Sequence, residues 1–140
     1  MIMINSGVCV QRKLNRRPFI AVVDDEDTVR RALARMLGAS QFDVGVFASG
    51  KEFLDSLDER KPDCVILDFQ MPGLTAIEVQ RQLAVAQIGV PVIVVSAHER
   101  AGARDQCLAA GAIAFLAKPL RRDDLIATIA AAIQRPPPNG

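Results

Sequence analysis

Short apolar runs alternate with segments of helical periodicity along most of the chain. Each run is four to six residues long and is followed by a segment whose apolar residues recur every three or four positions. Gly38 follows the first helical segment and is expected to end it, and Ser49 is a candidate cap for the second. The predicted strands are 19–23, 42–47, 64–67, 90–95 and 112–117. The predicted helices are 27–37, the segment after Ser49, 76–86, 100–110 and 122–134.

Strict alternation of strand and helix predicts an α/β domain. Helical crossovers between short strands favour a parallel sheet that is covered on both faces. For five strands with right-handed crossovers, the common doubly wound order is 2-1-3-4-5. We expect one domain over residues 18–134, a basic N-terminal tail over 1–17, and a Pro-rich tail or linker start over 135–140.

Polar side chains stand where four of the five predicted strands end. Asp24 and Asp25 follow the first strand, Asp68 the third, Ser96 the fourth and Lys118 the fifth. The second strand, which the predicted order places at the outer edge, ends without a charge. Ligands of doubly wound sheets bind at this edge, near the switch point between strands 1 and 3. Each residue alone is explained by a helix cap or a turn, but together they indicate one site.

The charges of this site favour a divalent cation. Three carboxylates and one ammonium leave a net charge of about −2, and all-oxygen ligands favour Mg²⁺, Mn²⁺ or Ca²⁺ over zinc. The turn after the first strand is acidic and lacks glycine, which disfavours a dinucleotide. A phosphoryl group could still enter if the metal and Lys118 neutralised it, because aspartate can attack phosphorus and form an aspartyl phosphate.

Composition and charge narrow the setting. The 140 residues carry a net charge of +1, but residues 1–20 hold four basic groups and no acid, so the rest is mildly acidic. The chain has no apolar stretch near the 20 residues of a membrane span and no secretory signal pattern. Its three cysteines are widely spaced, which favours reduced thiols. We therefore expect a cytoplasmic protein without membrane association.

The motifs at these strand ends resemble those of the receiver domain of two-component response regulators. The resemblance runs from about Pro18 to Gln134 and implies a flavodoxin-like (βα)5 fold. The matching pieces are Val22-Val23-Asp24-Asp25-Glu26, Val65-Ile66-Leu67-Asp68 with Met71-Pro72-Gly73, Val94-Val95-Ser96-Ala97, and Ala117-Lys118-Pro119. Ala76 stands where the family often has glycine, which is a minor departure at a helix start.

This resemblance implies a phosphoacceptor site that uses Mg²⁺. Asp68 would accept a phosphoryl group from the phosphohistidine of a sensor histidine kinase or phosphotransfer protein. Asp25 would bind Mg²⁺ directly, Asp24 would do so directly or through water, Asp68 would share the ion, and the main-chain carbonyl of Gln70 would be a further ligand. Lys118 would bind the phosphoryl oxygens.

The resemblance also implies a switch. Ser96 would donate its hydroxyl to the phosphoryl group, and Phe115 stands at the position of the family's aromatic switch residue. The Lys118–Pro119 peptide bond would be cis. We expect phosphorylation to alter the surface formed by 100–110, 112–117 and 122–134, with homodimerisation or partner binding as the result.

Three questions stay open at this stage. The chain stops where many relatives continue into a DNA-binding domain, so it is either a stand-alone receiver or a fragment cut at a linker. We expect no direct DNA binding by this chain.

We expect the domain to be phosphorylated itself and not to act as a turnover enzyme. The alternatives are a Mg²⁺-dependent phosphohydrolase with Asp68 as nucleophile, and an interaction module that works without phosphorylation. Gln70 argues against the hydrolase, which would need an acid two residues after the nucleophile.

Overall fold

The computed structural model describes residues 17–97 and 101–134, which form a five-stranded parallel sheet flanked by helices. The sheet has the order β2-β1-β3-β4-β5, which confirms the predicted doubly wound topology. The strands are β1 (Phe19–Val23), β2 (Asp43–Phe47), β3 (Cys64–Asp68), β4 (Val92–Ser96) and β5 (Ala114–Ala117). The helices are α2 (Asp27–Ala39), α3 (Gly50–Ser56), α4 (Ala76–Val85), α5 (Ala103–Ala109) and α6 (Arg122–Gln134).

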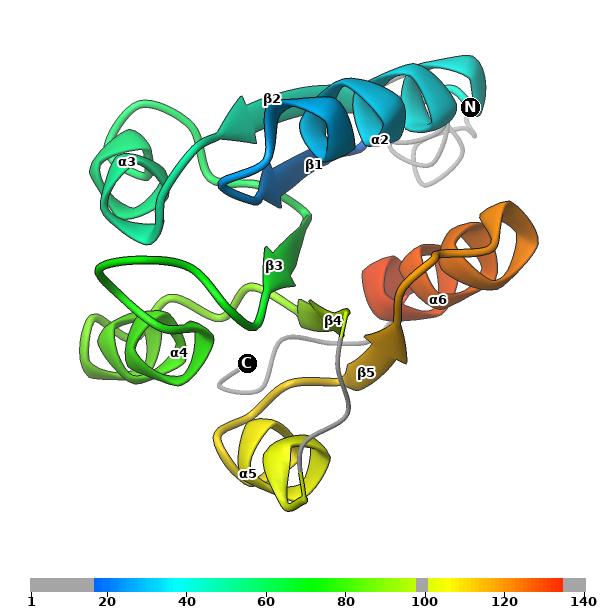
Figure 1. Cartoon of the computed structure of the whole chain (residues 1–140). Helices are drawn as coiled ribbons and strands as arrows, with labels where there is room; N and C mark the ends of the chain where they lie inside the picture. Colours follow the sequence, from blue (N-terminus) through cyan, green and yellow to red (C-terminus); the bar gives the residue numbers. More distant parts are fainter. Residues whose placement is uncertain (1–16, 98–100, 135–140) are drawn as a thin grey trace.

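The helices cover the two faces of the sheet. Figure 1 shows α2 and α6 on one face and α3, α4 and α5 on the other. Successive strand residues point to opposite faces, so β1 sends Ile20 toward the first pair of helices and Ala21 toward the other three. Burial on both faces explains why β1, β3 and β4 are continuous apolar runs.

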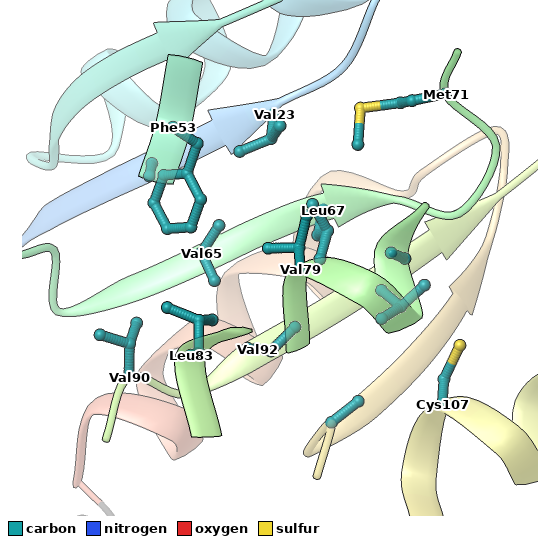
Figure 2. Packing of buried hydrophobic residues seen from close by; sticks show 14 of the residues in the cluster. Val23, Phe53, Val65, Leu67, Met71, Val79, Leu83, Val90, Val92 and Cys107 are labelled. Carbon is teal, nitrogen blue, oxygen red and sulfur yellow. The ribbon is translucent and has the colours of Figure 1, made fainter. Parts of the chain in front are cut away.

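The larger core lies under α3, α4 and α5. In Figure 2, Phe53 of α3 and Val79 and Leu83 of α4 pack over Val65 of β3. α3 approaches α4 so closely that a Cβ on Gly50 would lie 2.6 Å from a methyl carbon of Val79. Packing of this kind sets where each helix lies on the sheet.

Local hydrogen bonds shift several element ends from their predicted places. Gly38 does not end the first helix, which continues to Ala39, and the reversal comes at Gln41 with a φ of 73°. β4 begins at Val92 instead of residue 90, because the Val90 N–H turns back to Ile88. β5 begins at Ala114 because the Ala112 N–H closes the end of α5. α5 itself begins only at Ala103, after Gly102 in the left-handed conformation.

The predicted helix cap at Ser49 is confirmed. The Ser49 side chain accepts a hydrogen bond from the Glu52 N–H, so it caps α3. Cys64 and Cys107 are free and buried.

No helix within residues 17–97 and 101–134 has the length and apolarity to cross a membrane. The basic residues of 1–16, the lone His98, the start of the predicted helix at Arg100, and the Pro-rich tail lie outside the described residues.

Candidate functional site

The strand register brings the predicted site residues to one edge of the sheet. Asp68 lies beside Val95 of β4, and Ser96 lies beside Ala117 of β5. The Lys118 N–H donates to the carbonyl of Ser96 at 2.8 Å, which carries the ladder one residue past β5. Because all strands are parallel, their carboxyl ends and the side chains that follow them meet at this edge.

Lys118 lies between two buried carboxylates. Its Nζ is 2.8 Å from an oxygen of Asp24 and 3.2 Å from an oxygen of Asp68. Asp24 is 1% exposed and Asp68 is 5% exposed, so the two negative charges are largely withdrawn from water. One ammonium thus compensates two carboxylates, and the site keeps an excess of negative charge.

The backbone around Asp24 is fixed by contacts that sequence analysis did not identify. An oxygen of its carboxylate accepts a hydrogen bond from the Glu26 N–H at 2.9 Å. Its main-chain carbonyl accepts one from the Arg30 guanidinium at 2.7 Å. Arg30 also pairs with Asp27 at 3.2 Å, and the i,i+3 spacing of that pair was the available signal in the sequence. These contacts hold Asp24 in place before α2 begins.

Three carboxylates could hold a metal ion. Oxygens of Asp24, Asp25 and Asp68 all lie within 4.8 Å of one another, and Asp25 is exposed to solvent. Carboxylate oxygens, with water at the open side, are the donor set that Mg²⁺ prefers. Gln70 is exposed on the loop after β3, two residues beyond Asp68. The donors therefore fit the expected magnesium site.

The electrostatics of the site follow from burial and from the neighbouring acids. Burial and the charge of Asp24 raise the pKa of Asp68 from about 3.8 to about 6, although Lys118 opposes the shift. Burial alone would lower the pKa of Lys118, but its hydrogen bond to Asp24 and the charge of Asp68 outweigh that effect, so its pKa is raised. Lys118 remains charged at neutral pH, and Asp68 is a carboxylate whose charge is poorly stabilised.

The two residues expected to act as a switch are buried beside this site. Ser96 is 2% exposed at the end of β4, and Phe115 is 3% exposed in β5. The Phe115 ring meets Phe69 edge to face, with 6.1 Å between centroids, and the Arg104 guanidinium lies 5.3 Å from its centre. Phe69 directly follows Asp68, so the site and α5 are linked through two aromatic rings. The Lys118–Pro119 peptide bond is cis.

The chain is similar in sequence and fold to many known proteins. A model of the response regulator receiver domain family matches residues 20–130. The response regulator MprA of Mycolicibacterium vanbaalenii is 37% identical over 120 residues, which cover 86% of this chain and 52% of MprA. The response regulator protein TmoT of Ectopseudomonas mendocina is 32% identical, covering 91% of this chain and 58% of TmoT. The chain thus spans about half the length of these curated relatives.

Solved structures of receiver proteins have the same fold. A response regulator receiver protein from Burkholderia phymatum is 46% identical, with a TM-score of 0.76 over 87% of this chain and 99% of that one. FixJ-N is 29% identical, with a TM-score of 0.80 over 86% of this chain and 97% of that one. The family match, the relatives and the shared fold lead to one conclusion: this chain belongs to the response regulator receiver domain family.

Proposed function

We propose that this domain is a phosphorylation-controlled signalling module that accepts a phosphoryl group on Asp68 from a histidine kinase or phosphotransfer protein. The observation that carries the proposal is the position of Lys118, whose ammonium contacts the carboxylates of both Asp24 and Asp68. A site with one ammonium and three carboxylates suits a metal ion and a phosphoryl group that bind together.

The transfer follows from the chemistry of the carboxylate. An ionised oxygen of Asp68 attacks the phosphorus of a phosphohistidine, the new O–P bond forms as the N–P bond breaks, and the bonding electrons return to the imidazole nitrogen. Lys118 binds the developing charge on the phosphoryl oxygens. Asp24, Asp25, Asp68 and the main-chain carbonyl of Gln70 would hold Mg²⁺, which supplies positive charge to the phosphoryl oxygens when bound.

The burial of Asp68 gives the acceptor a suitable reactivity. Its pKa of about 6 leaves it ionised at neutral pH, yet the carboxylate is less well stabilised than one in water. Its attack on phosphorus relieves part of that electrostatic cost because the charge moves outward to the phosphoryl oxygens. We expect phosphorylation to slow as pH falls through about 6, where Asp68 takes up a proton.

The output would be a change in the surface of α5, β5 and α6. Ser96 would donate its hydroxyl to the phosphoryl group, and a shift there would reach Phe115, which packs against Phe69 and beneath Arg104 of α5. Two packings that differ by a few kcal/mol suffice for such a switch. Dimerisation or partner binding through this surface would follow.

An apolar groove beside the site suits a protein donor. Its volume is about 490 Å³. Lys118 lines both this groove and the acidic site, so a partner helix bound in the groove would bring a phosphohistidine to Asp68.

A substitution in the groove tests this. Ala32→Glu places a charge at an exposed groove position, and it should slow phosphoryl transfer from a phosphorylated kinase without slowing phosphorylation by acetyl phosphate. Ala130→Glu on exposed α6 is the control. The groove residues are Thr28, Val29, Ala32, Leu33, Met36, Lys118, Pro119 and Leu120.

The decisive test of the proposal is chemical modification followed by mass measurement. The domain with acetyl phosphate and Mg²⁺ should gain one hydroxylamine-labile phosphoryl group, and Asp68→Asn should gain none because an amide cannot form an acyl phosphate. Asp58→Asn, which changes an exposed acid after α3, should behave as the wild type. Stoichiometric modification of the Asp68→Asn protein would disprove the assignment. Catalytic release of phosphate from many substrates would instead favour the phosphohydrolase, which Gln70 disfavours.

A further inference from the structure

α5 is short and buries few of its residues. It is seven residues long, and only Ala103 and Cys107 are buried. α6, on the opposite face, spans 13 residues and buries Leu125, Ile129 and Ala132. Since apolar burial is the main force that holds a helix on a sheet, α5 is held less firmly than α6.

A buried glutamine of α4 adds a polar link to α5. Gln80 is 3% exposed, and its Nε2 donates to the main-chain carbonyl of Cys107 at 3.0 Å. That carbonyl can only accept, so the orientation of the amide is determined: the nitrogen faces Cys107 and the oxygen faces elsewhere. The same carbonyl also accepts from the Ala112 N–H at 3.0 Å, so it stays satisfied without Gln80.

The other end of this amide has no such partner. Oε1 of Gln80 is buried and accepts no hydrogen bond within residues 17–97 and 101–134. An acceptor buried without a donor costs more free energy than one neutral hydrogen bond contributes. A cavity of about 280 Å³ lies between α4 and the turn after α5, lined in part by Gln80, Leu83 and Ala110, but Oε1 itself is closed to solvent.

We propose that Gln80 is a positioning residue that keeps α5 only marginally seated on the sheet. When α5 is seated, the link to Cys107 forms but Oε1 is left unpaired. When α5 moves outward, water reaches both ends of the amide and the penalty is relieved. The proposal deepens the proposed function, because α5 belongs to the surface that phosphorylation of Asp68 would change.

Amide hydrogen exchange of α5 tests this in the absence of any phosphodonor. Gln80→Met keeps the length and volume of the side chain, removes the unpaired acceptor, and leaves the Cys107 carbonyl bonded to Ala112. We expect the exchange of 106–112 to slow by about three- to tenfold, with exchange of α6 unchanged. Gln82→Met, at an exposed position of the same helix, should change neither segment.

The opposite results would overturn the proposal. If Gln80 acted only as a stabilising hydrogen bond, Gln80→Met would speed the exchange of α5. Unchanged exchange of α5, or equal slowing of α5 and α6, would likewise refute a local effect on α5. Gln80→Leu gives a second variant: it also lacks the unpaired acceptor, so it should slow exchange of α5 selectively.

Beryllofluoride with Mg²⁺ then separates this proposal from the proposed function. In the wild type the complex should change α5 exchange, and in Gln80→Met that change should be smaller. If beryllofluoride has no effect on either protein while Gln80→Met still slows α5, the seating role stands and the phosphorylation switch fails. If beryllofluoride shifts α5 equally in both proteins and their basal exchange is the same, Gln80 has no such role.

Discussion

Replacing Asp68 by asparagine removes one of the two buried negative charges that share Lys118. The amide keeps an oxygen that can accept from Nζ, so the change is chiefly one of charge. The pKa of Asp68 is about 6 in the folded protein and near 3.8 without its environment. A difference of roughly two pKa units corresponds to about 3 kcal/mol of stability lost at neutral pH, before screening by water at the open edge of the sheet.

The sign of this effect follows from proton linkage. Because the folded pKa is raised, the folded protein binds the proton more tightly than the unfolded chain, and stability falls as pH rises through the window from about 4 to about 6. Asp68→Asn should therefore be more stable than the wild type at pH 7.5 in a chelator. With screening, a gain of about 1–2 kcal/mol raises the melting temperature by roughly 3–8 °C.

The assay is thermal unfolding of both proteins in EDTA between pH 4 and 8. The advantage of Asp68→Asn should fall to about half at pH 5 and nearly vanish at pH 4, where the wild-type carboxyl is protonated. Mg²⁺ should stabilise the wild type more than the variant, which lacks one carboxylate. Asp58→Asn should melt within about 2 °C of the wild type. A variant that melts lower than the wild type at pH 7.5, or a gain independent of pH, would refute the reasoning.

Three further predictions concern the site, the packing and the partners. Lys118→Met leaves Asp24 and Asp68 without their shared cation, so the melting temperature in EDTA should fall and its rise with Mg²⁺ should grow. Gly50→Ala should lose about 1–3 kcal/mol in urea unfolding, because its Cβ would lie 2.6 Å from a Val79 methyl, whereas Gly38→Ala, with open space in α2, should gain about 0.5–1 kcal/mol. The purified chain should show no nanomolar, sequence-selective DNA binding in a mobility shift at physiological salt.

Much of the architecture is determined by local sequence pattern. The apolar runs and helical periodicities identify every strand and helix of the described chain, and alternation alone leads to a parallel sheet. The same pattern places Asp24, Asp68 and Ser96 at strand ends, and parallel strands necessarily present those ends at one edge. Right-handed crossovers leave few topologies, and the sheet has the common one among them, 2-1-3-4-5.

The ends of elements required the tertiary structure. Gly38 stays helical because helix termination depends on which backbone groups bind the last carbonyls. Here Ser40 and Gln41 do so, and the helix ends two residues later than the glycine suggested. The start of β5 likewise depends on the Ala112 N–H, which bonds to α5 and not to the sheet. Competing hydrogen bonds of similar energy decide such boundaries, and periodicity does not rank them.

Contacts between distant side chains were also decided only by packing. The sequence by itself placed Lys118 at the edge that holds the acids, but only the folded chain shows its Nζ bridging Asp24 and Asp68, residues far apart along the sequence. Gln80 looked like an ordinary helix residue, yet its burial and its link to Cys107 arise from where α4 meets α5. Sequence pattern specifies which face or edge a residue occupies, because it repeats with the backbone. Which atoms then touch depends on helix positions and side-chain rotamers, and those are set by the packing of the whole core.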